Sequence, residues 1–283
     1  MPGEECEPVG EESKTLARAL ALLNCFSRGE PVLNTSQIAR RLGISRTATS
    51  RLLNTFARHR FVEPAPGGRG YQIGLGLFEI GALYLEANPA AQILLRALDE
   101  LVERTGWTSY LGILDGSDTI ILAYREGRHP VRFIFGIGDR LPSTTTALGK
   151  AVLACLPREE LDRRLGTGEL PVRTERSLRT RRELDAQLTE IRRRGWSLAE
   201  EESHPGLTAV GAAVLDARRE PLAGISISFF NHVPDASLTE QFGAIVSEVA
   251  RRVSERVAIG ADYGPAVLPR LGLPGRHERM GGG

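Results

Sequence analysis

Cysteine is scarce in this chain, since Cys6, Cys25 and Cys155 are the only three among 283 residues and lie far apart. No Cys-x-x-Cys pair or Cys/His cluster exists, so the sequence supports neither a zinc site nor a disulfide framework. Long apolar runs are also missing, because none approaches the ~18–20 residues that a membrane-spanning helix needs. The N-terminus lacks the charged-then-apolar pattern of a secretory signal. We therefore expect a cytoplasmic protein without metal, other cofactor or membrane contact.

Net charge is nearly absent too, because 36 basic and 35 acidic residues give only +1. The charge is nevertheless unevenly distributed. Residues 1–13 hold five glutamates and no base, whereas residues 14–73 hold ten basic and two acidic residues, a net charge of +8. Positive charge concentrated on one segment is the electrostatic signature of nucleic-acid binding.

Residues 35–56 have the pattern of two short helices joined at Gly43. Gly43 permits the left-handed backbone that ends a helix, and Ser45 is a good N-cap for the next helix. The second helix is expected to bury a stripe with a spacing of four, formed by Ala48, Leu52 and Phe56. This pattern is typical of the helix-turn-helix of DNA-binding proteins. The alternative is an ordinary helical hairpin with a solvated polar face.

The opposite face of the second helix carries hydroxyls, an amide and guanidinium groups but no acid, which suits the major groove of DNA. The side chains expected to read bases there are Arg46, Thr47, Ser50 and Asn54, and Ser45 at the start of the helix is also expected to contact the DNA. Arg51 lies at the edge of this face by our prediction and contacts the DNA backbone. Arg69 and a first-turn residue of the preceding helix, Ser36 or Gln37, are expected to do the same.

The remaining segments predict the domain organisation. A helix from Ser13 to near Gly29 precedes the two helices, and short strands at 61–63 and 71–73 flank a turn-rich loop, so the first domain resembles a winged helix.

Two helical patterns follow, broken at Asn88-Pro89, and then a mixture of strands and helices that favours an α+β sensor domain. The strands are expected at 107–114, 119–124, 131–135, 196–202, 208–215 and 222–229, and the helices near 146–155, 157–165, 180–194 and 237–259. We therefore expect a disordered acidic tail at 1–12, a winged helix-turn-helix domain at 13–74, a linker helix at 75–89, a GAF-like α+β domain at 90–259 and a disordered tail at 260–283.

Several segments in the second half carry a family resemblance. They are Gly138–Pro142 and Thr146–Ala154, then Gly195–Ser197 and Glu200–Glu202, then Gly206-Leu207, Ala212–Asp216 and Gly224–Ser228. In this order, after a winged helix, they resemble the IclR family of bacterial transcriptional regulators over roughly 13–259. The resemblance implies a homodimer or homotetramer that binds a double-stranded DNA operator and whose GAF-like domain binds a small metabolite. Most members are repressors and some are activators, so a repressor is expected.

The resemblance also implies a set of effector-binding residues: Leu141, Thr146, Ala147, Leu148, Ala199, Leu207, Ala209, Ser226 and Ser228. A helix that begins near Thr146 offers free amide groups to a carboxylate, and two serines two residues apart on a strand point the same way. The family often has an acid at position 199 and a polar residue at 209, and here both are alanine. We therefore expect an organic acid with an apolar, possibly aromatic, body.

Two other functional classes stay open. An architectural DNA-binding protein without a ligand ranks second, although it leaves most of the chain unexplained. An enzyme ranks third, because Gly224–Ser228 only superficially resembles a nucleophile elbow and sits inside a strand pattern. His129, His204 and His232 have no orienting acid assigned by the sequence. The Glu200–Glu202 run is expected to be a solvated strand edge rather than a metal site, since neighbours on a strand face opposite ways.

Overall fold

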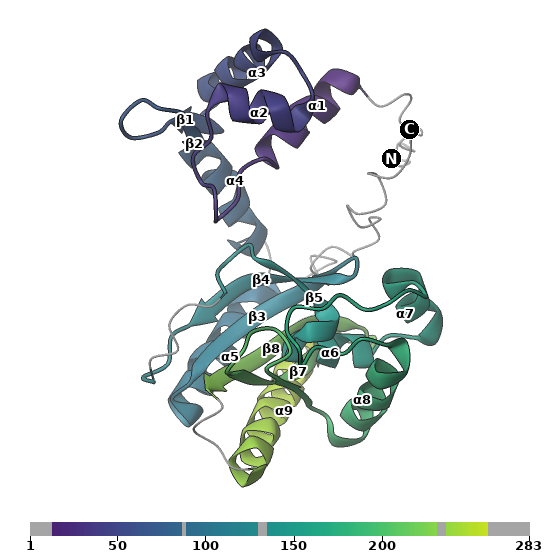
Figure 1. The fold of residues 1–283 in the computed structure, drawn as a ribbon. Coiled ribbons are helices and arrows are strands. Elements are labelled where there is room, and N and C mark those ends of the chain that lie inside the picture. Colours follow the sequence, from purple (N-terminus) through teal and green to yellow (C-terminus); the bar gives the residue numbers. More distant parts are fainter. Residues whose placement is uncertain (1–12, 87–88, 130–134, 231–235, 260–283) are drawn as a thin grey trace, which may run out of the picture. The chain divides into compact units, whose positions relative to one another are not determined.

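The computed structural model describes residues 13–86, 89–129, 135–230 and 236–259, and Figure 1 shows its elements. The chain divides into two compact units, Met1–Leu85 and Glu86–Gly283. The tails expected at 1–12 and 260–283 lie outside the described residues, as does the strand expected at 131–135 apart from Phe135. Among the described helices, none has the length and apolar character to cross a membrane.

The first unit is a winged helix, as the sequence predicts. Its small core is formed where helices and ribbon meet, by Leu22, Leu33, Ile38, Leu53 and Val62, all nearly without exposed surface. The ribbon strands pair antiparallel. The elements are α1 (Lys14–Leu23), α2 (Thr35–Leu42), α3 (Arg46–Arg58), β1 (Val62–Pro64), β2 (Tyr71–Ile73) and α4 (Leu75–Glu86).

Local signals fix the helix-turn-helix. The Asn34 side chain caps α2 in a reciprocal capping box with Gln37, which satisfies two backbone donors that the helix leaves unpaired. Gly43 ends α2 with φ 63°, a left-handed conformation that a glycine adopts without strain. The Ser45 hydroxyl accepts from the Ala48 amide and starts α3.

The first helix is shorter than expected, because α1 ends at Leu23 rather than near Gly29. The Arg41 guanidinium donates to the Cys25 carbonyl (2.7 Å) and pairs with the Glu30 carboxylate. That carbonyl would otherwise accept a hydrogen bond from a continuing helix. A side chain from α2 therefore holds the chain just past the end of α1, a contact that the local pattern does not contain.

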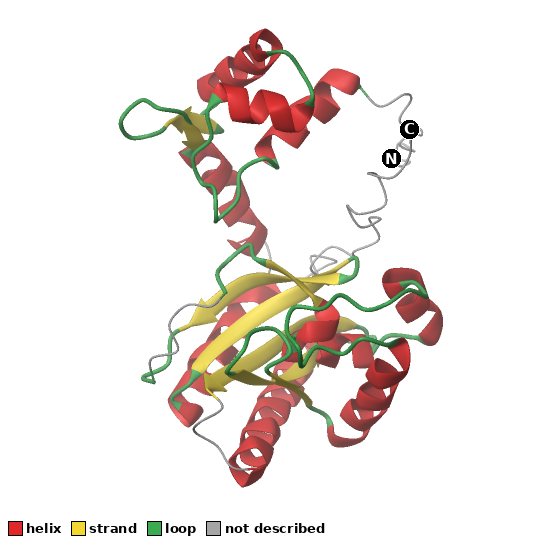
Figure 2. Ribbon diagram, viewed as in Figure 1, coloured by secondary structure: helices red, strands yellow, loops and turns green. Residues whose placement is uncertain are grey.

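The second unit is an α+β domain with a six-stranded antiparallel sheet of order β5-β4-β3-β8-β7-β6. Helices cover both faces of this sheet, as Figure 2 shows. The architecture agrees with the expected GAF-like domain. Its elements are α5 (Pro89–Thr105), β3 (Thr108–Asp115), β4 (Asp118–Arg125), β5 (Arg140–Pro142), the 3-10 turn η1 (Ser143–Thr145), α6 (Ala147–Ala154), α7 (Arg158–Leu165), α8 (Arg181–Arg194), β6 (Ser197–Glu200), β7 (Leu207–Leu215), β8 (Pro221–Phe230) and α9 (Ala236–Ile259).

Strand alternation gives the two faces of the sheet different roles. On β8, Ile225, Ile227 and Phe229 face α5 and α9 and belong to the main hydrophobic core. The residues between them, Ser226 and Ser228, face α6 together with Gly224. The apolar face therefore holds the domain together, while the other face has polar groups available for binding.

Candidate DNA-reading surface and effector cavity

The exposed face of α3 holds most of the residues predicted to read DNA. Arg46, Thr47, Arg51 and Asn54 are exposed and Ser50 is half-buried. The opposite face is centred on Thr49 and Leu53, which have 0% of their surface exposed. With 3.6 residues per turn, the side directly opposite these two belongs to Thr47, Arg51 and Asn54.

This geometry corrects two details of the sequence interpretation. The buried stripe was expected at Ala48, Leu52 and Phe56, but these side chains are only half-buried and flank its centre. Thr49 occupies the core because its hydroxyl donates to the Ser45 carbonyl (3.1 Å), which satisfies the polar group. Arg51 consequently lies in the middle of the exposed face, not at its edge.

The residues outside α3 that are predicted to contact the DNA backbone differ in how exposed they are. The Gln37 side chain accepts from the Asn34 amide as part of the capping box, and Ser36 is half-buried. Arg69 is exposed on the loop between β1 and β2. It borders a hollow that the wing shares with the start of α2, lined also by Asn34, Thr35, Pro64, Gly68, Gly70 and Tyr71. The structure thus brings Arg69 and the first turn of α2 to one concave surface.

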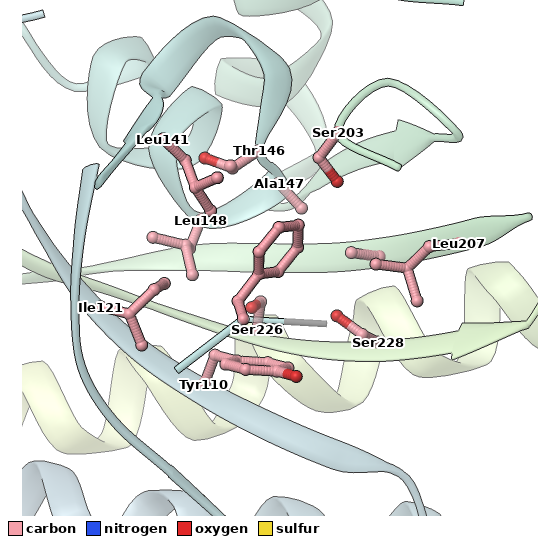
Figure 3. A pocket seen from close by; sticks show the side chains of 12 residues that line it. Tyr110, Ile121, Leu141, Thr146, Ala147, Leu148, Ser203, Leu207, Ser226 and Ser228 are labelled. Carbon is pink, nitrogen blue, oxygen red and sulfur yellow. The ribbon is translucent and has the colours of Figure 1, made fainter. Parts of the chain in front are cut away.

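A cavity lies between α6 and the sheet of the second unit, as Figure 3 shows. Its side chains leave room for little more than a water molecule, so an organic ligand requires some of them to move. No lining residue among those described is charged. The lining residues are Tyr110, Ile121, Phe135, Leu141, Thr146, Ala147, Leu148, Ser203, Leu207, Ala209, Ser226 and Ser228.

Glycines on three strands let α6 approach the sheet closely. A Cβ atom at Gly211 would lie 2.8 Å from the Leu148 nitrogen, and one at Gly224 would lie 2.7 Å from the Leu148 oxygen. A Cβ atom at Gly112 would lie 2.8 Å from a Leu148 methyl group. A side chain at Gly211 or Gly224 would therefore displace the backbone in the first turn of α6, and one at Gly112 would displace the Leu148 side chain.

The cavity offers hydrogen-bond donors that the protein itself does not use. Within the described residues, the hydroxyls of Tyr110, Ser203, Ser226 and Ser228 have no hydrogen-bond partner. The amides of Ala147 and Leu148 likewise have no described acceptor, while Thr146 caps the next amide in the chain. Burial raises the pKa of Tyr110 to about 12, so its phenol remains a neutral donor at physiological pH. These donors border the cavity space, so a ligand rich in acceptors could hydrogen-bond to them there.

The structure brings together eight of the nine predicted effector residues and leaves one outside. Ala199 does not line the cavity, and its methyl group packs in a small buried cluster with Ala147 and Ala209. Sequence reasoning missed Tyr110, Ile121, Phe135 and Ser203. Tyr110 pairs directly with Ser226 across β3 and β8, so only the pairing register of the two strands could have identified it.

The Glu200–Glu202 run is solvated at Glu200 but not at Glu202, which corrects part of the sequence interpretation. Glu202 is 5% exposed and its carboxylate lies 2.6 Å from the ammonium of Lys150, which is 0% exposed. Burial lowers the pKa of Lys150 and raises the pKa of Glu202, while each charge partly offsets the shift of the other. A strand pattern sends neighbours to opposite faces, but here the strand ends at Glu200 and the chain turns inward.

The structure does not place the candidate catalytic or metal-binding residues that it describes in the geometry that those functions need. Gly224–Ser228 lies inside β8, not at a strand-to-helix turn. His129 packs against Trp107 with tilted rings, 4.4 Å between ring centroids, and the His204 ring nitrogen contacts the Pro205 carbonyl. His232 lies outside the described residues. Among the described residues, no cluster of three His, Cys, Asp or Glu side chains could hold a metal ion.

A winged helix with a cationic recognition helix, in one chain with an α+β domain, defines the class of helix-turn-helix transcriptional regulators. Comparison with known protein families shows which family of that class the chain belongs to. The IclR helix-turn-helix domain matches residues 15–66, and the C-terminal domain of bacterial transcriptional regulator IclR matches residues 82–255. The chain belongs to the IclR family.

Individual relatives agree with this assignment. The chain is 31% identical to the transcriptional repressor IclR of Escherichia coli K12 over 256 residues, 89% of this chain and 93% of that protein. The IclR crystal structure from Thermotoga maritima has a TM-score of 0.70 at 27% identity, over 86% of this chain and 98% of the other. An IclR homologue from Microbacterium hydrocarbonoxydans, crystallised with 4-hydroxybenzoate, shares the fold with a TM-score of 0.75 at 18% identity, over 86% and 99% of the two chains.

Proposed function

We propose that this protein is a cytoplasmic repressor whose operator binding is controlled by a small organic acid in the cavity of its second unit. The observation that carries the proposal is the set of unpartnered donors in that cavity, whose described lining residues include no charged side chain. A carboxylate has acceptors and no donors, so it complements this set. The apolar side chains Leu141, Leu148 and Leu207 would receive the body of the acid, because they cannot satisfy a second polar group.

The test is a titration of operator complexes with acids. The operator is first selected from a random-sequence DNA library, and its release from the full chain is followed by fluorescence anisotropy. The first probe is 4-hydroxybenzoate, the acid found with the Microbacterium relative, followed by benzoate and short aliphatic acids. We expect acids to change operator occupancy and the cation benzamidine to have no effect. A preference for the cation would rule out the carboxylate site.

The DNA surface is proposed to divide into base-reading and backbone-contacting residues. Arg46, Thr47, Ser50, Arg51 and Asn54 on α3 read bases, with Arg51 included because it lies in the middle of the exposed face. The backbone contacts come from Arg69 on the wing and from Ser36, Gln37 and Ser45 near the helix starts.

Two substitutions should separate these roles. Asn54→Ala removes an amide that can pair with an adenine edge, so operator affinity should fall by ~1–3 kcal/mol and specificity should relax at one base pair. Arg69→Ala removes a phosphate contact, so affinity should fall evenly across sequences and the salt dependence should decrease by about one counterion. Competition binding at several salt concentrations measures both. Equal operator binding by Asn54→Ala and the intact protein would show that α3 is oriented differently.

Loss of one cavity hydroxyl should weaken the effector without affecting DNA. In Ser228→Ala, acid affinity should fall by ~1–3 kcal/mol, the range for a hydrogen bond to a charged group, while operator affinity without acid stays unchanged. Because coupling between two sites is reciprocal, this variant should also need more acid to release the operator. Calorimetry on the full chain measures the affinity, with the exposed Ser237→Ala as control. Unchanged affinity in both Ser226→Ala and Ser228→Ala would place the effector elsewhere.

The active form is proposed to be a dimer on a palindromic site, because one recognition helix covers too few base pairs for specificity. Helix α4 is apolar over most of its surface yet exposed, with Phe78 at 70%, Leu83 at 57% and Ile80 at 54%. A helix apolar on all sides is normally covered. A second copy of the chain is the covering partner that two-fold symmetric DNA requires, and a tetramer would add contacts between the second units.

The alternative, an architectural DNA-binding protein, predicts that no small molecule alters DNA occupancy. The cavity with unpartnered donors favours the regulator, because an architectural protein has no need of it. Turnover of an acid by the purified chain would instead indicate an enzyme.

A further inference from the structure

Lys150 occupies an unusual position for a charged side chain. It is one of only two lysines in the chain, and it lies on α6 with 0% of its surface exposed. Its ammonium donates to the Gln187 side chain (2.6 Å) and to the Leu198 carbonyl (2.6 Å). The third partner is the Glu202 carboxylate, at 2.6 and 2.7 Å. An ammonium has three N–H groups, so each has an acceptor.

The Glu202 partner belongs to the loop at 201–206 between β6 and β7, which also carries Ser203. Ser203 lines the cavity, and Figure 3 shows its hydroxyl at the same end as Ala147. One ion pair therefore connects α6, whose first turn holds the unused amides, to the loop that holds an unused hydroxyl. These two sets of donors lie on separate elements and need a fixed relation to bind one ligand together.

The loop adopts a conformation that needs such support. Glu201 has φ 56°, in the left-handed region that side chains other than glycine rarely adopt. Backbone strain of this kind persists where surrounding contacts over-determine the conformation. Beyond the ion pair, the Thr174 hydroxyl donates to the Glu201 carbonyl (2.6 Å), and the Ser177 hydroxyl donates to the Glu202 carbonyl (2.7 Å).

A buried ion pair is better suited to fixing a geometry than to adding stability. The cost of desolvating both charges offsets most of their attraction, and apolar replacements of similar volume are often equally stable. If the loop moved, however, the Lys150 ammonium would be left buried with an unpaired charge. The pair therefore disfavours every loop position except the one that brings Glu202 against Lys150.

Building on the proposed function, we propose that Lys150 and Glu202 are positioning residues that hold Ser203 as an effector-binding hydroxyl beside the first turn of α6. Neither charge lines the cavity itself. They act on the ligand through the loop, and Ser203 makes the contact. This assignment adds a third serine to the two of β8 and gives the buried charges a role in ligand recognition.

The test uses the full chain with both charges replaced by apolar side chains, Lys150→Met/Glu202→Leu. This double variant should fold with nearly normal stability, so that a loss of function reflects geometry. Amide hydrogen exchange without ligand is the first measurement. We expect exchange in 201–206 to become at least about tenfold faster while β7 and β8 stay protected. The matched control is Glu200→Gln, which changes an exposed neighbouring carboxylate. Unchanged exchange in 201–206 would overturn the proposal.

The second measurement is a double-mutant cycle with 4-hydroxybenzoate and benzoate as probes, read by calorimetry. Ser203→Ala and the apolar pair should each weaken binding by about tenfold, the effect of one hydrogen bond. The variant that combines Ser203→Ala with the apolar pair should bind the acid no more than about twofold more weakly than Ser203→Ala alone, because both changes remove the same contact. Additive losses would show that the pair does not act through Ser203 and would overturn the proposal. If no acid binds the intact chain, the proposed effector class is wrong, and the exchange measurement alone decides whether the pair holds the loop.

Discussion

Phe78→Glu should convert the protein into a monomer and weaken operator binding by about 10²–10⁴-fold, the range gained when two linked sites bind together. Phe78 is the most exposed of the apolar side chains on α4, at 70%. A carboxylate there would have to be desolvated in a dimer interface without a described partner, which costs far more than the apolar contact it replaces. Sedimentation at micromolar concentration and operator titration measure the two effects.

The control for this prediction is Phe78→Leu, which keeps an apolar side chain and should remain a dimer with normal operator affinity. Leu16 and Leu20 on α1, at 60% and 54% exposed, are two further large apolar side chains available to the interface. Leu20→Glu should then also weaken dimerisation and operator binding, but less than Phe78→Glu does. A Phe78→Glu protein that sediments as a dimer would exclude α4 as the interface.

Lys150→Met should destabilise the second unit by about 3–5 kcal/mol, because it leaves the Glu202 carboxylate buried without its partner. Replacing both, as Lys150→Met/Glu202→Leu, should restore most of that loss, since no charge then remains buried. Urea unfolding followed by tryptophan fluorescence measures this effect. The only two tryptophans, Trp107 and Trp196, both lie in the second unit, so the signal reports that unit alone.

The matched control is Lys14→Met, which removes the other lysine of the chain from an exposed position on α1. It should leave the unfolding midpoint unchanged. Equal stability of Lys150→Met and the intact chain would show that water or a neighbouring group compensates the Glu202 charge. A double variant less stable than the single one would contradict the ion-pair account.

Much of the fold is predictable from the sequence because its signals are local. The glycine that ends α2 and the serine that caps α3 act within a few residues, and these identify the helix-turn-helix. Alternation along β8 separates its core-facing residues from Ser226 and Ser228. The strand and helix patterns of the second unit also depend on residues that are close in the sequence. The same is true of each motif that carries the family resemblance.

The structure differs from the sequence prediction where contacts with distant segments decide the outcome. Helix α1 is shorter than the pattern predicts, and Arg41, on another helix, holds the chain just past its end. The stripe of α3 was rotated because Thr49 has its hydroxyl satisfied within the helix and can be buried like an apolar residue. Ala199, predicted to bind the effector, packs against Ala147 and Ala209 and does not line the cavity.

The sequence by itself determined the two domains and the recognition helix, because periodicity and capping are properties of neighbouring residues, and the family resemblance of the sequence implied most of the cavity residues. Only the tertiary structure decided that Tyr110 faces Ser226 and that Glu202 meets Lys150, residues 52 positions apart in the chain. The pairing register of two strands and the inward turn of a loop set those contacts. Both arise from packing against distant segments, so no local pattern encodes them.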